Sequence, residues 1–295
     1  MSYQRNFKLV NIPSYLFHNL KVDQFNYIQK IFFLLRAKLI IFILDKFNKQ
    51  LLCSLINSIC YSKEKIKYDS PNYYIEKYNN KIFYPKDRLN RIFIGFDKRL
   101  NIIAETYGLN KVSFQKGDIF LDCGANIGEV YFAISKIEKN IDYIAFEPDR
   151  ETFKFLQKNC DNKKNVILNN FALSSDNGTS ELFIDSEGAN SSLLNFGTNK
   201  KIKVSTKRLD SINFAKNIKF LKIDAEGFEP EVLHGTKQIF DMIEFISVDY
   251  GQERGLSQES TVVSVLNFLY QNNFELIYQS EIRPVGLFKN KKVKN

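Results

Sequence analysis

The feature that most constrains this chain is the stretch from residue 119 to residue 130, which reads IFLDCGANIGEV. A short apolar run ends at Asp122, and Gly124 and Gly128 then mark a tight turn. After Gly128 the apolar residues recur at helical spacing. Strand, glycine-rich turn and helix in this order predict a nucleotide-type cofactor site beyond the carboxyl end of a strand in an open parallel sheet.

The glycine spacing distinguishes two kinds of cofactor. A dinucleotide site has the pattern G-x-G-x-x-G, in which the middle glycine lets the backbone approach a pyrophosphate. Here Asn126 stands at the middle position, and Asp122 lies two residues before Gly124. A carboxylate repels a diphosphate but can attract a cation, and S-adenosylmethionine carries a sulfonium and an amino group without phosphate. The turn therefore favours S-adenosylmethionine; an ordinary strand-to-helix turn is the alternative.

From residue 119 onward strand-like and helix-like segments alternate, which predicts a mostly parallel sheet with helices on both faces. A long polar loop at 185–200 is flanked by two further strand-like pieces, 181–184 and 201–206. We expect helices at 99–107, 150–160 and 259–270 and one that starts at 229–230. The main strands are expected at 119–121, 143–147, 166–168, 220–224, 245–250, 275–278 and 285–288.

Two positions after the turn fit the rest of such a cofactor. Glu147 ends the second strand, where an acid can accept hydrogen bonds from both ribose hydroxyls. The alternative is an acid that favours the start of the next helix, after Pro148. Ala172 follows the third strand, and from its position in this layout we expect its backbone to lie beside the adenine ring.

Acidic residues at two further strand ends point to the reaction. Asp224 follows the fourth strand and could accept or orient a hydroxyl proton, as transfer of a methyl group to oxygen requires. Glu226 could support it, whereas Glu229 is better placed to cap the next helix. Asp224 and Asp249 could share a divalent cation, but two carboxylates without a further ligand are weak grounds, and no metal is predicted.

Other polar residues carry less information. The isolated His18 and His234 are interpreted as surface or packing residues. Ser191 and Ser192 in the long loop either contact substrate or belong to an ordinary polar loop.

The positive charge is concentrated before the cofactor turn. The net charge is +9, yet residues 1–115 hold 19 Lys and Arg against 8 Asp and Glu. This asymmetry suggests an anionic partner, such as a membrane surface, a nucleic acid or an acidic glycan, or else a solvated lysine-rich surface. Residues 24–60 read as apolar helices, which could make peripheral membrane contact but more simply pack on protein. A polar linker is expected at 62–72.

The cysteines and the N-terminus bear on the compartment. The four cysteines form no C-x-x-C motif, and no apolar segment follows Arg5 and Lys8. We therefore expect a reducing, cytoplasmic environment without a signal peptide, with membrane-peripheral attachment as the alternative.

Taken in order, the motifs resemble the FkbM family of S-adenosylmethionine-dependent methyltransferases. The acidic stretch from Asp224 to Glu229 is the most distinctive part. Two departures are the Asp at 249, where the family commonly has Glu, and residues 1–75, which have no counterpart. The matching segments are 117–118, 120–128, 146–148, 170–174, 190–193, 209–210, 218–229 and 232–235.

The resemblance implies a class I methyltransferase fold, a Rossmann-like, mostly parallel seven-stranded sheet with helices on both faces, at 76–295. From charge and apolar spacing, not from the resemblance, we expect a helical basic extension at 1–75. It implies O-methylation of a saccharide, glycoconjugate or secondary metabolite. The alternative is an RNA methyltransferase or nucleic-acid-binding protein using the basic segment, although an Asn/Asp-Pro-Pro-Tyr/Phe motif, expected for methylation of base amino groups, is absent. Asp224 and Glu226 would be catalytic, and the cofactor residues would be Asp122, Gly124, Ala125, Asn126, Gly128, Glu147, Pro148 and Ala172.

Overall fold

A computed structural model describes residues 49–59, 64–85, 88–89, 91, 95–161, 163–185 and 191–293 of the 295-residue chain. The chain divides into two compact units, Met1–Arg99 and Leu100–Asn295. Each unit is described by itself. The boundary expected between residues 75 and 76 lies inside a strand, β2 (Asn72–Lys77).

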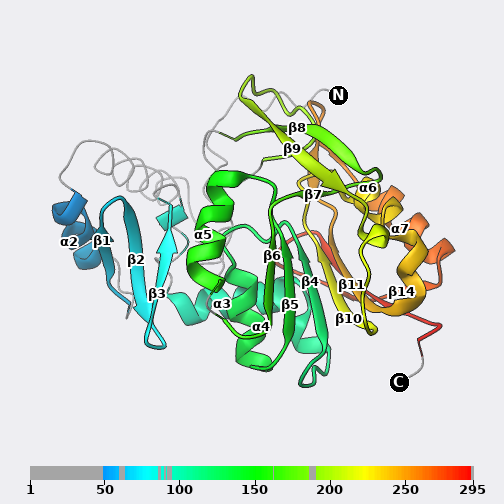
Figure 1. The fold of residues 1–295 in the computed structure, drawn as a ribbon, viewed down its shortest axis with the longest axis horizontal. Coiled ribbons are helices and arrows are strands. Elements are labelled where there is room, and N and C mark those ends of the chain that lie inside the picture. Colours follow the sequence, from blue (N-terminus) through cyan, green and yellow to red (C-terminus); the bar gives the residue numbers. More distant parts are fainter. Residues whose placement is uncertain are drawn as a thin grey trace, which may run out of the picture. The chain divides into compact units, whose positions relative to one another are not determined.

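The front unit contains one described helix and a small antiparallel sheet (Figure 1). Helix α2 (Lys49–Ile59) is followed by β1 (Ile66–Asp69), β2 and β3 (Asn80–Tyr84) in spatial order β1-β2-β3. Tyr78 and Asn79 join β2 to β3 with positive φ angles of 51° and 58°. Two such residues form a turn whose twist suits a tight hairpin, and Asn tolerates this conformation well.

Two expectations for this region need correction. The polar segment 62–72 is not simply a linker, because Ile66 in β1 is buried and pairs with Ile75. A wholly helical extension over 1–75 is likewise wrong for the described residues, since β1 and β2 lie within it. The helical prediction for 24–60 is confirmed at Lys49–Ile59. The remainder, 24–48, and with it most of the membrane-contact hypothesis, lies outside the described residues.

The larger unit is built on a seven-stranded sheet in the order β14-β15-β11-β10-β4-β5-β6 (Figure 1). All neighbouring strands are parallel except at β15, which is antiparallel to both of its neighbours. This confirms the predicted mostly parallel sheet. The strands are β4 (Ile119–Cys123), β5 (Asp142–Phe146), β6 (Val166–Asn169), β10 (Ile218–Ile223), β11 (Ile243–Asp249), β14 (Phe274–Gln279) and β15 (Val285–Asn290).

The strand order reverses at β4. From β4 the chain moves outward through β5 to β6, and it later returns to the other side of β4 with β10 and β11. The connections after β4 and β10 therefore leave the same edge of the sheet in opposite directions. Ligands of open α/β sheets bind in the crevice that this arrangement opens at the carboxyl ends of the strands.

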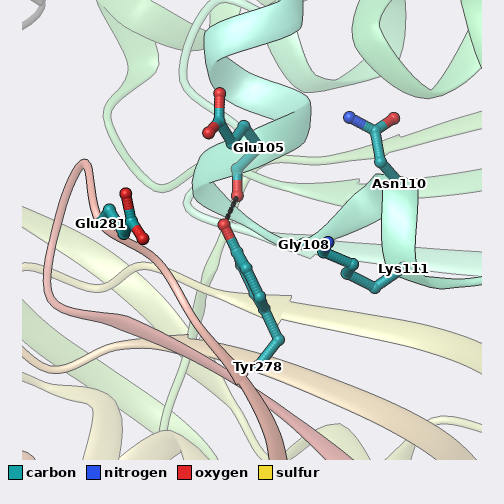
Figure 2. A pocket seen from close by; sticks show the side chains of 6 residues that line it. All are labelled: Glu105, Gly108, Asn110, Lys111, Tyr278 and Glu281. Atoms are coloured by element: carbon teal, nitrogen blue, oxygen red, sulfur yellow. Dashed lines mark hydrogen bonds between the residues drawn. The ribbon is translucent and has the colours of Figure 1, made fainter.

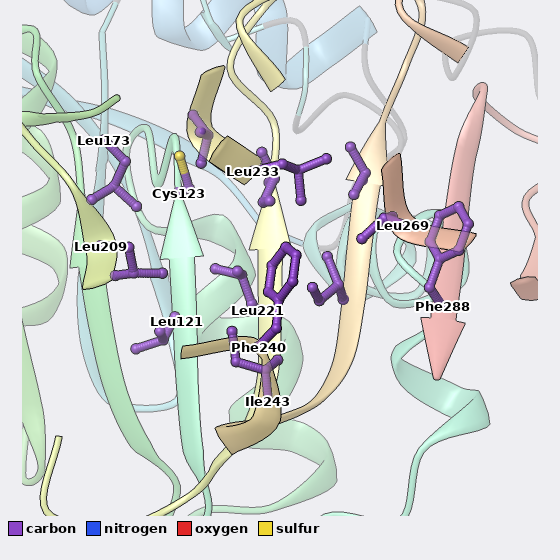
Figure 3. Packing of buried hydrophobic residues seen from close by; sticks show 14 of the residues in the cluster. Leu121, Cys123, Leu173, Leu209, Leu221, Leu233, Phe240, Ile243, Leu269 and Phe288 are labelled. Atoms are coloured by element: carbon purple, nitrogen blue, oxygen red, sulfur yellow. The ribbon is translucent and has the colours of Figure 1, made fainter. Parts of the chain in front are cut away.

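Side-chain alternation gives the sheet two different faces. One face carries Leu121, Leu221 and Ile246 and packs against α6 (Glu229–His234), η6 (Lys237–Met242) and α7 (Val262–Gln271) (Figure 3). On the other face Phe120 stacks on Phe220 with ring centroids 4.9 Å apart. Such aromatic pairs add about 1 kcal/mol to the stability gained by burial.

This second face becomes polar toward the carboxyl ends of the strands. Two residues beyond the stacked pair, the same alternation places Asp122 on β4 and Lys222 on β10, both fully buried. On β11 it places Ser247 and Asp249, which are also buried. Buried charges at adjacent strand ends are costly unless they are paired, so their partners define the site.

Shorter elements surround this sheet. Helix α4 (Glu129–Ile137) packs on the aromatic face, where Tyr131 meets Tyr143 edge to face. Helix α5 (Arg150–Cys160) agrees with its predicted bounds, and Asp149 caps it. The remaining elements are α3 (Phe96–Thr106), η4 (Leu109–Lys111), η5 (Leu209–Ser211), the sheet of β7 (Ala172–Leu173), β9 (Lys201–Lys207) and β8 (Gly178–Phe183), and the hairpin of β12 (Gln252–Arg254) and β13 (Glu259–Ser260).

The predictions for the main strands and for α3, α6 and α7 are confirmed, with bounds shifted by a few residues. The short β7, β12 and β13 were not predicted. Over the residues that the structure describes, every helix is too short or too polar to cross a bilayer.

Candidate functional site

Hydrogen bonds within the protein fix the backbone of the cofactor turn, residues 124–128. Gly124, Asn126 and Gly128 have positive φ angles of 74°, 56° and 89°. The amides of Gly124 and Ala125 both donate to the carbonyl oxygen of Phe146 at 3.0 Å. Side chains complete the turn: the carboxylate of Glu147 accepts the Asn126 amide at 2.9 Å. The predicted turn residues thus do lie together at the end of β4.

The engaged amides bear on which cofactor the turn can take. A pyrophosphate site needs backbone N–H groups that point at the phosphates. Here the amides of residues 124–126 have protein acceptors, the amide of Ile127 donates to the Asn126 side chain, and that of Gly128 donates to Ala125. The donor set therefore fits a cofactor without phosphate better than a dinucleotide.

Glu147 lies at the end of β5 and is nearly buried. One carboxylate oxygen accepts the Asn126 amide and the other accepts the Asp149 amide, each at 2.9 Å. These two contacts hold the cofactor turn and the start of the segment that leads into α5, and both roles weighed from the sequence stay predictions.

Asp122 occupies a different environment from the one expected. Its side chain is fully buried, and its carboxylate accepts a hydrogen bond from the hydroxyl of Tyr143 and lies 3.0 Å from the ammonium of Lys222. The charge that was expected to attract a cationic ligand is thus already neutralised. A contact of Asp122 with the cofactor stays a prediction, but in this structure its partner is Lys222.

Pro148 follows the end of β5, and Ala172 follows the end of β6. The side-chain amide of Asn170 donates to the carbonyl oxygens of Glu147 and Pro148, at 2.8 and 3.1 Å. That contact brings the loop after β6 beside the predicted ribose acid. Ala172 itself is buried in β7, where it pairs with Thr206 of β9. Its predicted role beside adenine is untested.

Asp224, directly after β10, lies against the cofactor turn. A Cβ atom added to Gly124 would come within 2.0 Å of the Asp224 carbonyl oxygen, so glycine is needed where the two strand ends meet. The Asp224 carboxylate accepts a hydrogen bond of 2.5 Å from the hydroxyl of Tyr107, which is buried after α3. It also lies 3.7 Å from the guanidinium of Arg283, in the turn between β14 and β15.

Three more carboxylates gather around Asp224, and we call the group of Asp224, Glu226, Asp249 and Glu253 the acid cluster. Carboxylate oxygens of Asp224, Glu226 and Glu253 lie within 4.8 Å of one another. Arg283 approaches Asp249 to 2.5 Å and Glu253 to 3.4 Å. One guanidinium therefore faces several acidic groups.

This crowding changes the protonation of the acid cluster. Burial, followed by repulsion from Glu253 and Asp224, raises the pKa of Glu226 well above its ordinary value. Burial also raises the pKa of Asp249, although Arg283 opposes the rise. Both shifts favour the protonated forms of these carboxylic acids. The catalytic roles expected for Asp224 and Glu226 stay predictions.

Two neighbouring residues have structural roles. Glu229 accepts the amides of Ala225 and Gly227, at 3.1 and 3.0 Å, and so holds the loop before α6. The helix-capping role expected for Glu229 is not seen, because both amides precede the helix. Ser192, nearly buried, donates to the carbonyl oxygen of Glu226 at 2.8 Å. Its hydroxyl therefore anchors the long loop beside the acid cluster. The ring of His234 packs on Phe268, which fits its reading as a packing residue.

The described acidic residues raise the question of a metal. Asp224, Glu226 and Glu253 supply oxygen ligands of the type that hard divalent cations prefer. The pair considered from the sequence is less suitable, because Asp249 is bound to Arg283. An acidic group that already contains a guanidinium does not require a metal, and the prediction of none stays a prediction.

A polar pocket of about 370 Å³ lies nearby in the same unit (Figure 2). The hydroxyl of Tyr278, near the end of β14, donates to the carbonyl oxygen of Glu105 in α3 at 3.1 Å. The segments that line the pocket are the two that send Tyr107 and Arg283 to Asp224. The lining residues are Glu105, Gly108, Asn110, Lys111, Tyr278 and Glu281.

Sequence reasoning missed four residues of this site: Tyr107, Lys222, Glu253 and Arg283. A signal existed for Lys222, since it interrupts an apolar strand two residues before Asp224. The other three reach the site from distant segments, and no local pattern marks them.

Comparisons with known proteins were made for the whole chain. The family model described as the methyltransferase FkbM domain matches residues 122–276, more than half of the chain. No curated protein matches the chain.

The chain also resembles solved methyltransferase structures. The N-terminal domain of human METTL16 with SAH is 13% identical, with 83% of this chain and 81% of that chain covered and a TM-score of 0.38. The plantazolicin methyltransferase BpumL is 12% identical, with 70% and 90% covered and a TM-score of 0.43. Precorrin-6y C5,15-methyltransferase from Geobacter metallireducens is 14% identical, with 65% and 88% covered and a TM-score of 0.38. Likeness at this level carries no information on the acceptor.

Proposed function

Because the chain belongs to the FkbM family of methyltransferases, which use S-adenosylmethionine, we propose that it methylates a hydroxyl group on a saccharide, a glycoconjugate or a secondary metabolite. The observation that carries the proposal is the position of Asp224. Its backbone carbonyl, directly after β10, lies against Gly124 of the cofactor turn, and Tyr107 and Arg283 hold its carboxylate in place.

The residues around β4 and β5 fit the cofactor. S-adenosylmethionine, when bound, supplies a methyl group made electrophilic by its sulfonium. The turn of residues 124–128 offers a closed backbone without a phosphate cradle, and Glu147 offers a carboxylate for vicinal hydroxyls. We assign Glu147 to the ribose and the turn to the neighbouring part of the cofactor.

The carboxylate of Asp224 is suited to orient the acceptor hydroxyl and to act as its general base. Because the donor methyl is already activated, the protein mainly aligns the two reactants, and effective alignment supplies much of the rate. The acceptor oxygen forms the new bond to carbon as the sulfur–carbon bond breaks, and S-adenosylhomocysteine leaves with the electron pair. Asp224 orients the acceptor hydroxyl and takes its proton, while Tyr107 fixes the carboxylate.

The acid cluster limits the charge of the acceptor. Four carboxylic groups face a single guanidinium, so the acid cluster holds more acidic groups than Arg283 can pair. A phosphate or carboxylate on the acceptor would meet like charge at short range. We therefore propose a neutral or amino-substituted polyhydroxylated acceptor. The RNA alternative rests only on the basic front segment, and the same repulsion opposes it.

The lysines of that segment further weaken the RNA alternative. Lys67 pairs with Glu76 at 2.6 Å, and Lys77 pairs with Glu64 at the same distance. The Lys67–Glu76 pair is exposed and contributes little stability, whereas Lys77 pairs with the buried Glu64. Both pairs neutralise part of the positive charge locally.

The pocket of Figure 2 also supports a polyhydroxylated acceptor. It presents two carboxylates, an amide, an ammonium and a phenol, which together can donate and accept hydrogen bonds.

A panel assay tests the proposal. The protein would be incubated with S-adenosylmethionine and neutral oligosaccharides, amino sugars, uronic-acid or phosphate-bearing glycans, or RNA. Formation of S-adenosylhomocysteine would be measured, and mass spectrometry would locate the methyl group. We expect an O-methyl product from a neutral or amino glycan, with Asp224→Asn as the inactive control. Methylation of RNA alone, of acidic glycans alone or of nitrogen would reject the proposal.

A further inference from the structure

We propose that Lys222 is a positioning residue that locks the cofactor turn and the reaction carboxylate to one another. The part that concerns Asp224 rests on the proposed function, whereas the part that concerns the turn rests only on binding of the cofactor. Lys222 makes this link from inside the sheet, since its side chain is 2% exposed.

The ammonium of Lys222 has three hydrogens, and three acceptors surround it. It lies 3.0 Å from a carboxylate oxygen of Asp122. It donates to the carbonyl oxygens of Cys123 and Gly124, at 3.0 and 2.8 Å. These carbonyls belong to the last residue of β4 and the first of the turn, where the chain leaves the sheet. Lys222 therefore fixes the exit direction of the turn.

The sheet register extends this link to Asp224. Lys222 and Asp122 are Cα partners on the neighbouring parallel strands β10 and β4. Two residues further along each strand come Asp224 and Gly124, which meet at the point where no side chain fits on Gly124. A change in the position of Lys222 would therefore move both strand ends.

Tyr107 connects the same ammonium to the reaction carboxylate. The Lys222 nitrogen lies 5.3 Å from the centroid of the Tyr107 ring, within the range of a cation–π contact. The hydroxyl of that ring donates to Asp224 at 2.5 Å. One charged group thus contacts the turn on one side and the ring that fixes Asp224 on the other.

Alternative roles for Lys222 are less consistent with these contacts. Stability alone does not call for it, because a buried ion pair is often no more stable than well-packed apolar residues. Burial would lower the pKa of Lys222, but the charges of Asp122 and Asp224 raise it overall, so the group stays an ammonium and is no general base. An apolar side chain could fill the space but could not bind the two carbonyls.

A matched pair of variants tests the proposal. Lys222→Met keeps the length of the side chain and removes its three donors. Asn290→Leu is the control, because Asn290 is also buried and donates to two carbonyls, those of Phe240 and Ile243, away from the turn. Thermal unfolding would first establish a temperature at which both variants are folded. Isothermal titration with S-adenosylhomocysteine would then give the affinities.

We expect both variants to unfold at lower temperature but only Lys222→Met to lose at least tenfold in affinity. Wild-type affinity in Lys222→Met, or an equal loss in Asn290→Leu, would overturn the proposal. If Asp122, left unpaired, prevents folding, Lys222→Met/Asp122→Asn replaces the single variant and should show the same loss. A double variant that still fails to fold, while Asn290→Leu folds, would also overturn it. This titration needs no acceptor. Its result can therefore be interpreted even if the panel assay rejects methyl transfer to a hydroxyl.

Discussion

Buried charges are balanced differently at two places in the sheet: the carboxyl ends of β4 and β5, and those of β10 and β11. Beside the cofactor turn one ammonium, Lys222, meets one carboxylate, Asp122, and the remaining ammonium donors go to backbone carbonyls. In the acid cluster several carboxylic groups surround the single guanidinium of Arg283.

Under the proposed function a ligand completes the acid cluster, whereas the charge of Lys222 is already paired. The Lys222 ammonium donates to two backbone carbonyls, and its charge is paired with Oδ1 of Asp122, which makes no hydrogen bond of its own. In the acid cluster one buried oxygen of Glu226 and one of Glu253 make no hydrogen bond among the residues described. Buried polar atoms usually find a partner, and under the proposed function the hydroxyl groups of an acceptor would supply donors there.

The largest expected effect is a loss in the rate of methyl transfer without a matching loss of cofactor binding. Asp224→Asn keeps the shape of the side chain but removes its ability to take a proton. We expect methyl transfer to fall by about 10²–10⁴-fold, the usual contribution of a general base. The rate would be measured as formation of S-adenosylhomocysteine with an acceptor found in the panel assay.

Glu226→Gln is the matched control for that variant. Because burial and the neighbouring carboxylates raise the pKa of Glu226 and so favour its neutral form, a neutral amide should replace it with less than about a tenfold loss of rate. Equal losses in Asp224→Asn and Glu226→Gln would show that the acid cluster acts as a unit and would remove the special role of Asp224.

A smaller effect, on stability, is expected from replacing Arg283, whose guanidinium faces the acid cluster. Arg283→Gln leaves Asp249, which is fully buried, without its counter-ion. Since the Arg283 side chain is 35% exposed, solvent screens part of the loss, and we expect the free energy of unfolding to fall by about 2 kcal/mol. Chemical denaturation at pH 7 would measure it.

Adding Asp249→Asn to Arg283→Gln sharpens the comparison. The double variant removes both charges and should recover at least half of the lost stability, because no unpaired carboxylate remains. Strictly additive losses would mean that the two residues do not interact, contrary to the 2.5 Å contact.

The remaining effect concerns pH and Glu229. Burial raises the pKa of Glu229 to about 7, although backbone hydrogen bonds oppose the rise. The folded protein therefore holds a proton that the unfolded chain releases between about pH 4.5 and pH 7, so this group makes stability fall as pH rises through that window. Glu229→Gln should remove this fall, a relative gain of about 3 kcal/mol at pH 7.

Thermal unfolding of both proteins from pH 5 to pH 7.5 would test the last prediction. Parallel curves for the wild type and Glu229→Gln would contradict it. Glu229 lies outside the turn and the acid cluster. The result therefore measures how strongly burial raises the pKa of a carboxyl group at this edge of the sheet.

Local patterns predicted the sheet well because its signals lie within short segments. The short apolar run of β4 and the proline in the first turn of α6 are properties of a few consecutive residues. The same approach failed at β1, where lysines and Ser70-Pro71 suggested a linker. That strand is defined by pairing with β2, which a local pattern does not reveal.

The site was predictable in part for a similar reason. Asp224 and Glu147 are recognisable because each directly follows a strand. Tyr107 and Arg283 are not, since they come from before β4 and from the turn between β14 and β15. The environment of Asp122 was misjudged because its charge was considered without Lys222, which is adjacent only across the sheet.

The central claim is that cofactor binding belongs to the ends of β4 and β5 and the reaction to the end of β10. Isothermal titration of S-adenosylhomocysteine into Glu147→Gln and Asp224→Asn tests it most directly, because neither measurement needs an acceptor. We expect Glu147→Gln to weaken binding at least tenfold, about 1.4 kcal/mol, and Asp224→Asn to change it less than about threefold. Loss of affinity in Asp224→Asn with wild-type affinity in Glu147→Gln would contradict the account.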